Sequence, residues 1–229
     1  MLYCNPIGEV FFVQSDLAID MATGFTNALP FSFDDTVPPV PVMRFTVEQY
    51  HELVRVGLLE EDAPVELLDG WIVPKMNKSA GHSCAIYQLR DALEAAIPAG
   101  YSVRLQDSVT LQESEPEPDL ALARGTVLDF ADRHPIPAEV PLIIEVADSS
   151  LRRDRGIKKS LYARARVAEY WIVNLAARVV EVYTEPAGEG RQADYGTHRD
   201  YVDNDTVPLH VEGREIERIS VTAILPPRK

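Results

Sequence analysis

The chain has little that would place it in a disulfide-stabilised or membrane-bound class. Its 229 residues include only two cysteines, Cys4 and Cys84, which form neither a disulfide framework nor a metal-ligand cluster. The N-terminus lacks a basic start followed by an apolar run, and no apolar stretch is long enough to span a bilayer. We therefore expect a reducing, cytoplasmic location and no membrane partner.

Positive charge is also scarce. Against 36 Asp and Glu the chain has 22 Lys and Arg, which gives a net charge of −14. This balance argues against tight non-specific binding to nucleic acid. A local basic face could still bind it, because a charged ligand responds to the electrostatic potential near its site and not to the net charge of the whole protein. The apolar fraction of 46% is ordinary for a globular protein, and the length suits one domain with appendages.

Proline and the hydrophobic periods suggest how the chain is divided. Residues 1–43 are interrupted by prolines and have no clear period, so we interpret them as an N-terminal arm or linker. Residues 44–229 predict one domain that ends in a C-terminal β extension, in which the apolar stretch 219–225 pairs with the main sheet. Within this domain the clearest predictions are a helix from Thr46, a hairpin turning at Asp69-Gly70, and a helix over 79–97.

Two acids in apolar segments are the centre of the chain. Asp119 opens the segment 118–123 and Glu145 lies inside the segment 141–147, and both segments are typical of short buried strands. An ionised carboxylate in such a strand is costly unless a cation or hydrogen-bond donors satisfy it. A helix predicted over 151–166 follows and carries Lys158. Two strand-borne carboxylates and a lysine are the parts of a magnesium site that hydrolyses phosphodiester bonds.

The same predicted helix carries the only dense basic patch of this acidic chain. Helical spacing places Arg152, Arg155, Lys159 and Arg166 on one side. Charge runs of this kind are usually solvated helix faces. Beside a carboxylate pair, however, a positive face suits a phosphate backbone, and we name Arg152, Arg155 and Lys159 as candidate nucleic-acid contacts.

Two further residues have competing interpretations. Glu66 lies on the first strand of the hairpin, where the pattern alone favours a solvent-facing side chain. His82 lies near the start of the helix over 79–97, on its apolar side. A lone histidine there is more often a partly buried structural residue, while the functional alternative is that it reaches the acids or a phosphate.

Taken together, these segments resemble the Uma-two family of endonucleases, which belongs to the restriction-endonuclease-like, PD-(D/E)XK superfamily. The resemblance covers about residues 45 to 185. It rests on the order and spacing of Val65-Glu66-Leu67-Leu68-Asp69-Gly70, His82, Pro118-Asp119, Ile143-Ile144-Glu145-Val146, Asp154 with Lys158 and Tyr162, and Val167-Ala168-Glu169-Tyr170-Trp171-Ile172-Val173.

The resemblance implies an α/β fold, a mixed sheet flanked by helices, with acids converging at one edge. It implies Asp119 and Glu145 as the pair that binds Mg²⁺ or Mn²⁺, with the carbonyl of Val146 as a further ligand and Glu66 as a third acid. The superfamily's usual lysine stands two residues beyond the glutamate, where this chain has Ala147. In the Uma-two pattern a lysine of the next helix takes its place, and Lys158 matches it.

Three hypotheses follow for the function. The first is a metal-dependent endonuclease acting on DNA, with catalytic residues Asp119, Glu145, Lys158, Glu66 and His82. The second is an inactive nuclease fold that binds nucleic acid or protein. The third is a purely structural network in which Glu145 pairs with Lys158 and no metal binds. Nucleases that cut both strands often need a second active site, and a homodimer interface could use residues 1–43 and the C-terminal strands.

Overall fold

The protein is described from a computed structural model covering residues 2–4, 10–12 and 43–228. The chain divides into two units, Met1–Val42 and Met43–Lys229. In the first unit, β1 (Leu2–Cys4) pairs antiparallel with β2 (Val10–Phe12). The remainder of the predicted arm up to residue 42 lies outside the described residues, and its role as a linker stays a prediction.

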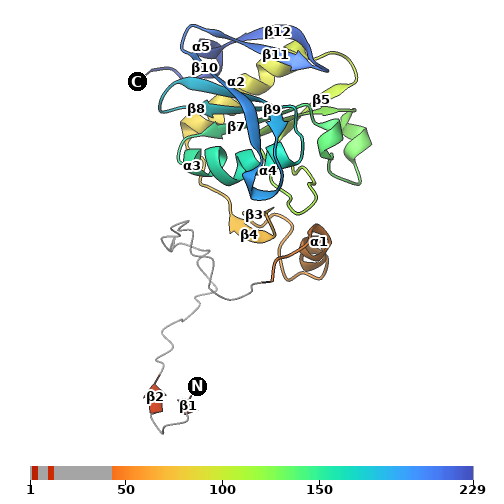
Figure 1. Cartoon of the computed structure of the whole chain (residues 1–229), viewed down its shortest axis with the longest axis vertical. Coiled ribbons are helices and arrows are strands. Elements are labelled where there is room, and N and C mark those ends of the chain that lie inside the picture. Colours follow the sequence, from red (N-terminus) through yellow and green to blue (C-terminus); the bar gives the residue numbers. More distant parts are fainter. Residues whose placement is uncertain (1, 5–9, 13–42, 229) are drawn as a thin grey trace. The chain divides into compact units, whose positions relative to one another are not determined.

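The second unit is built on a six-stranded mixed sheet (Figure 1). Its strand order is β10-β9-β8-β7-β6-β5, and all neighbours are antiparallel except β7 and β8, which are parallel. The strands are β5 (Tyr101–Leu105), β6 (Leu120–Arg124), β7 (Leu142–Ala147), β8 (Glu169–Asn174), β9 (Val179–Ala187) and β10 (Asp194–Val202). The predicted mixed α/β class, with a sheet flanked by helices, is confirmed.

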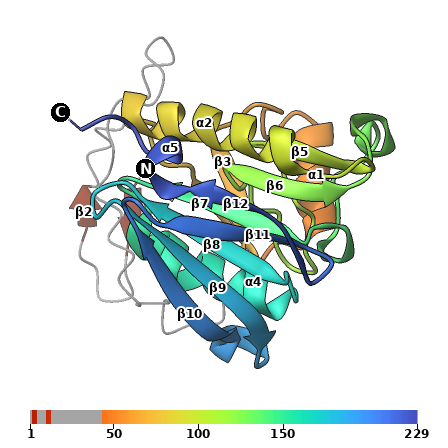
Figure 2. The ribbon, with the colours of Figure 1, turned by 90° about the horizontal axis from the view of Figure 1, so that it is seen from above.

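Separate hydrophobic clusters cover the two faces of this sheet. One cluster joins it to helix α2 (Ala80–Ala96), to the hairpin β11 (Thr206–Val211) and β12 (Arg214–Ser220), and to α5 (Val221–Ile224) (Figure 2). The other joins it to α4 (Lys159–Arg164). Side chains of β7 alternate between the faces, as a strand period of two requires: Ile144 packs in the first cluster and Ile143 in the second. Glu145 therefore belongs to the face covered by α4.

The elements before the sheet agree with their sequence signals. Thr46 caps α1 (Val47–Arg55) in a capping box with Gln49. The hairpin of β3 (Val65–Leu68) and β4 (Trp71–Pro74) turns at Asp69 and Gly70, whose φ values of 50° and 76° are those that such a two-residue turn needs.

Short 3₁₀ turns are η1 (Val127–Phe130), η2 (Pro137–Glu139) and η4 (Gly190–Gln192). No described helix is long and apolar enough to cross a bilayer.

Two predictions about the elements were wrong. The helix expected over 151–166 is interrupted, because α3 (Leu151–Arg153) is followed by a π-helical turn, η3 (Asp154–Lys158), before α4 begins. Gly156, with φ −102° and ψ −105°, leaves helical geometry inside that turn. The stretch 219–225 does not pair with the main sheet, because Ile219 pairs with Val207 in the separate β11–β12 sheet and the chain then turns into α5.

Candidate active site

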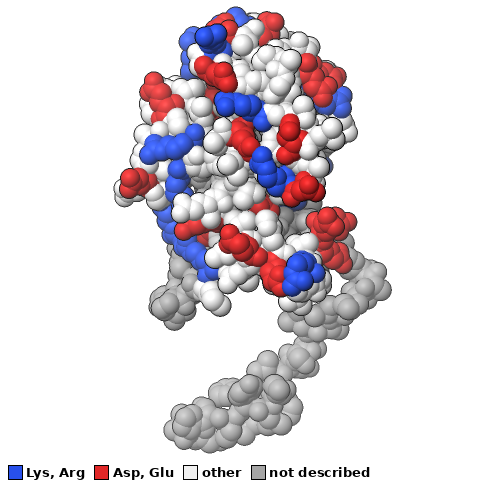
Figure 3. All heavy atoms as spheres, turned by 90° about the vertical axis from the view of Figure 1, so that its right-hand side faces the viewer, with Lys and Arg blue, Asp and Glu red and all other residues white. Residues whose placement is uncertain are grey.

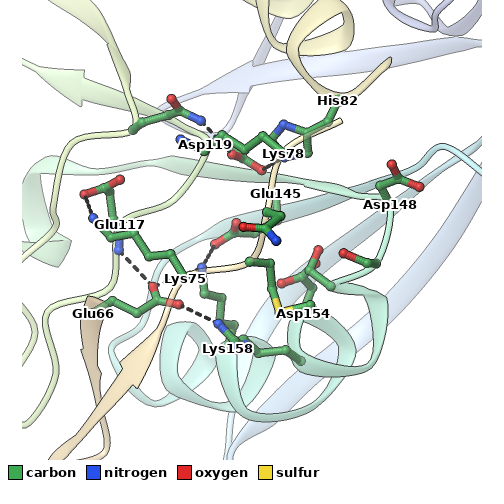
Figure 4. A pocket seen from close by; sticks show the side chains of 16 residues that line it. Glu66, Lys75, Lys78, His82, Glu117, Asp119, Glu145, Asp148, Asp154 and Lys158 are labelled. Atoms are coloured by element: carbon green, nitrogen blue, oxygen red, sulfur yellow. Dashed lines mark hydrogen bonds and ion pairs between the residues drawn. The ribbon is translucent and has the colours of Figure 1, made fainter. Parts of the chain in front are cut away.

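A pocket lies at one end of the inner strands β6 and β7, where the start of α2, the loop after β4, the end of β7 and the π-helical turn meet (Figure 4). Six carboxyl side chains line it, against four from lysine or arginine and one from histidine. The charged lining residues are Glu66, Glu117, Asp119, Glu145, Asp148, Asp154, Lys75, Lys78, Arg153, Lys158 and His82. Negative charge is therefore in excess at the point where the sequence predicted the site.

Asp119 and Glu145 come from neighbouring antiparallel strands. The register pairs Leu120 of β6 with Ile144 of β7. One step further along this register sets Asp119 opposite Glu145, and directly opposed residues in such a pair have neighbouring side chains. The structure thus brings together two acids that are 26 positions apart in the chain (145 − 119).

Three donors surround the carboxylate of Asp119. The backbone N–H of Val146 donates to Oδ2 at 2.8 Å, and Nε2 of Gln106 donates to Oδ1 at 3.2 Å. Nε2 of His82 lies 3.1 Å from Oδ2. Burial alone would raise the pKa of Asp119, but the hydrogen bond and charge of His82 and the Val146 amide outweigh it and lower the pKa. Asp119 is therefore held as a carboxylate in a fixed orientation.

Glu145 is buried and shares one oxygen between two donors. Nζ of Lys158 lies 2.9 Å from Oε1, and the hydroxyl of Tyr162 donates to the same oxygen at 2.8 Å. Burial, reinforced by the charges of neighbouring acids, raises the pKa of Glu145 well above its usual value, although Lys158 opposes this. Burial would lower the pKa of Lys158, but the surrounding carboxylates outweigh it and raise the pKa. The lysine of the following helix therefore reaches the acid on β7, with its charge retained.

Glu66 is 3% exposed, so the solvent-facing side chain favoured by the strand pattern was wrong. Its Oε2 lies 3.2 Å from Nζ of Lys158 and accepts the backbone N–H of Glu117 at 3.2 Å. Its Oε1 accepts from Nη1 of Arg153, also at 3.2 Å. Both oxygens are engaged, so in this arrangement Glu66 holds Lys158 in place beside Glu145.

The π-helical turn supplies a further buried acid. Asp154 is 1% exposed, and its Oδ2 accepts a 2.6 Å hydrogen bond from the hydroxyl of Ser150. Burial raises the pKa of Asp154 to about 6, with Lys158 and the Ser150 hydrogen bond acting in the opposite direction. Since π-turns within helices are frequent at functional sites, the interruption at Gly156 fits this location.

The predicted basic contacts are not in this pocket. None of Arg152, Arg155 and Lys159 lines it, although all three are on the same chain segment as Lys158. Arg155 donates from Nε and Nη2 to Glu181 at 2.8 and 2.6 Å. Nζ of Lys159 lies 2.9 Å from Asp194. A contact of these residues with nucleic acid stays a prediction. Glu181 and Asp194 already neutralise part of the positive charge of Arg155 and Lys159.

Sequence reasoning missed Gln106, Arg153 and Lys75. Gln106 follows β5, whose Leu105 pairs with Leu120, so the register sets it opposite Asp119; the sequence predicts both strands but does not show that they pair. Lys75 forms an ion pair with Glu117, and its place two residues after a predicted strand gave no indication of that partner. Arg153 is buried against the β3–β4 hairpin, where its Nη1 donates to Glu66 and to the carbonyl of Pro74, and the periodicity of its own segment does not predict these partners.

The donor set suits a hard divalent cation held by few protein ligands. In the described part of the chain, no three His, Cys, Asp or Glu side chains are gathered in a way that could hold a metal ion. Magnesium often binds through only one or two carboxylates and keeps several waters. No hydrogen bond among the described residues engages Oε2 of Glu145, and the pocket has more acids than bases. Asp119 and Glu145 therefore fit such an ion.

With this geometry in place, comparison with known proteins identifies the class. The model of the Uma2 family, described as "Putative restriction endonuclease", matches residues 47–217, and the chain belongs to this family. It also resembles a crystal structure described as a "putative nuclease belonging to DUF820" from Anabaena variabilis, with a TM-score of 0.59 and 14% identity over 79% of this chain and 97% of that one. That likeness shows the fold. Comparison with curated proteins gives no significant match.

Proposed function

We propose that this protein is a metal-dependent endonuclease that hydrolyses phosphodiester bonds of DNA in the Asp119–Glu145 pocket. The observation that carries the proposal is the position of Lys158, 2.9 Å from Glu145 and 3.2 Å from Glu66, in a pocket with excess negative charge. A Uma2 domain over most of the described chain supports a nuclease activity.

Each residue has a role that follows from its contacts. Asp119 and Glu145 would hold Mg²⁺ or Mn²⁺, with the carbonyl of Val146 as the third protein ligand that the family pattern implies. When bound, such an ion lowers the pKa of a coordinated water and neutralises charge on the phosphate. His82 and Gln106 orient the carboxylate of Asp119, and Glu66 positions Lys158.

Lys158 is the residue suited to stabilise the reaction's developing charge. Its raised pKa keeps it an ammonium ion, and an ammonium group fixed before the reaction begins stabilises the extra negative charge of a pentacovalent phosphate. Oxyanion stabilisers of this kind are worth about 100- to 1,000-fold in rate.

A structural alternative also has an observation in its favour. A purely structural network predicts pairing of Glu145 with Lys158, and that pair is present at 2.9 Å. The two interpretations differ in their response to metal, because a network that is complete without an ion gains nothing from one.

The test is cleavage of supercoiled plasmid by purified protein with magnesium, with manganese and with a chelator, alongside Asp119→Ala. We expect nicking that requires metal and is lost in the variant. Equal trace activity in both proteins, or nicking that persists in chelator, would contradict the proposal and favour an inactive nuclease fold.

A further inference from the structure

A second cluster of charges surrounds Asp69, at the turn between β3 and β4. Nη1 of Arg44 donates to Oδ2 at 2.7 Å, and Nη2 of Arg191 donates to the same oxygen at 3.2 Å. Both terminal nitrogens of Arg164 donate to Oδ1 at 3.2 Å. The three arginines come from separate segments, namely the residues before α1, the end of α4 and the turn η4. Folding thus gathers three guanidinium groups on one carboxylate.

The balance of charge here is the reverse of that in the pocket. Glu113, 3.9 Å from Arg164, is the only other acid paired with these arginines among the described residues, so three positive charges face two negative ones. A guanidinium has more N–H donors than one shared carboxylate can accept. Side chains of Arg44 and Arg191 are 36% and 61% exposed, which leaves donors accessible to a ligand. On the face drawn in Figure 3, Lys and Arg side chains follow one edge, which shows that positive charge gathers locally although the chain has a net charge of −14.

The cluster is held in place before any ligand arrives. A Cβ atom on Gly70 would lie 2.4 Å from Cβ of Arg44, so the turn accepts this arginine only because residue 70 is glycine, at φ 76°. The guanidinium of Arg44 lies 5.8 Å from the ring centre of Trp71, and the N–H of Phe45 donates to the carbonyl of Gly70 at 2.9 Å. Pre-ordered side chains lose less conformational entropy when they bind.

Two ion pairs fix the distance from the cluster to the pocket. Glu66 contacts Lys158 and Asp69 contacts Arg164, so the short segments 66–69 and 158–164 each lead from the pocket to the cluster. Three residues of strand span about 10 Å. Six residues of helix span about 9 Å. The cluster is therefore about 10 Å from the pocket, which is about three base-pair steps along the axis of a B-form duplex.

We propose that Arg44, Arg164 and Arg191 bind backbone phosphates of the DNA a few base pairs away from the phosphodiester that occupies the pocket. This inference rests on the proposed function and adds the surface that positions its substrate. Arginine suits this role because its planar fork matches phosphate oxygens. Such contacts fix the register of the duplex and carry no base specificity.

The experiment measures binding of a fluorescein-labelled duplex of mixed sequence by anisotropy, in EDTA, over a series of salt concentrations. Arg191→Gln is the main variant, and Arg191→Lys keeps its charge. Arg228→Gln is the matched control, because Arg228 is also exposed and pairs with an aspartate, Asp203, at 2.8 Å. Loss of one phosphate contact lowers the slope of log K against log salt by about 1 and weakens binding about fivefold at physiological salt.

We expect that loss for Arg191→Gln, a greater one when Arg44→Gln is added, and wild-type slopes for Arg191→Lys and Arg228→Gln. An unchanged slope for the double variant, or an equal fall for Arg228→Gln, would overturn the inference while leaving the pocket's activity intact. A wild-type protein that binds no duplex at low salt would overturn this inference and the proposed substrate together. Circular dichroism of each variant separates loss of a contact from loss of the fold.

Discussion

Glu145 and Glu181 occupy the same row of the sheet, and their surroundings differ. The register pairs Glu145 of β7 with Ile172 of β8, and Ile172 with Glu181 of β9. Both glutamates are buried, at 4% and 1% exposure. The segment from α3 to α4 supplies a cation to each of them, Lys158 to Glu145 and Arg155 to Glu181.

The two carboxylates differ in how completely they are satisfied. Glu181 accepts two hydrogen bonds from Arg155, one from Tyr183 and one from Asn174. Burial would raise its pKa, but these donors outweigh it and the pKa is lowered. Glu145 instead shares one oxygen between two donors in a cluster of acids, and its pKa is raised. Glu181, saturated and outside the pocket, holds the structure together, whereas Glu145 lines the acidic pocket and keeps one oxygen without a hydrogen bond from the described residues, so it can still bind a cation.

The largest expected effect is on cleavage. Glu145→Gln should abolish metal-dependent nicking, because it removes one of the two carboxylates available to the ion. Glu181→Gln makes the same change on the same row of the sheet and should leave the nicking rate within about threefold of wild type, since its partners lie outside the pocket. The comparison fails if the two variants lose activity equally while both remain folded.

The next effect separates two adjacent lysines. Lys158→Gln should lower the single-turnover cleavage rate by about 100- to 1,000-fold, because it removes a fixed cation beside the reacting phosphate. Lys159→Gln alters the neighbouring residue, whose partner Asp194 belongs to β10, and should change the rate little. Equal rates for the two variants would remove Lys158 from the mechanism.

The third effect concerns stability, for which Glu181→Gln should be the more damaging of the two glutamate substitutions. Glu181→Gln should lower the free energy of unfolding by about 2 kcal/mol, because it removes the charge that pairs with Arg155 and replaces one of the two acceptor oxygens with an NH2 group that cannot accept from its donors. Glu145→Gln should cost less, since it relieves an excess of buried negative charge. Urea denaturation of both variants in EDTA checks the order, and a larger loss for Glu145→Gln would refute the distinction between the two carboxylates.

The smallest expected effect depends on pH. The folded state raises the pKa of Asp154 to about 6, so it binds this proton more readily than the unfolded chain does. The protonated group's contribution to stability is present at low pH and is lost as pH rises through about 6. The change in the free energy of unfolding caused by Asp154→Asn, relative to wild type, should therefore be more stabilising by about 2 kcal/mol at about pH 8 than at about pH 4.5. Urea denaturation in EDTA at both values measures it, and an effect independent of pH would contradict the predicted titration.

Local signals predicted much of the fold. The Asp69-Gly70 turn, the Thr46 cap and the helical period of α2 each involve residues close in the chain, where propensity and spacing act directly. The mixed sheet required the family resemblance, because strand order depends on contacts between distant segments. The pairing of the 219–225 stretch was wrong for that reason: an apolar run shows that a segment is buried and does not show what covers it.

Parts of the site were predictable because acids in apolar strands need partners. Asp119 and Glu145 stood out on that argument, and Lys158 followed from the resemblance. The burial of Glu66 could not be read from a strand with mixed neighbours, because its partners Lys158 and Arg153 come from a helix about 90 residues away in the chain. The arginine cluster at Asp69 was hidden for the same reason, since its members are far apart in the sequence.

One measurement tests the central distinction most directly: calorimetric titration of Mn²⁺ into wild-type protein, Glu145→Gln and Glu181→Gln. The account predicts binding to the wild type, loss of binding in Glu145→Gln, and retained binding in Glu181→Gln. A wild-type protein that binds no metal, or binding that survives Glu145→Gln, would contradict it and leave the pocket as a structural ion-pair network.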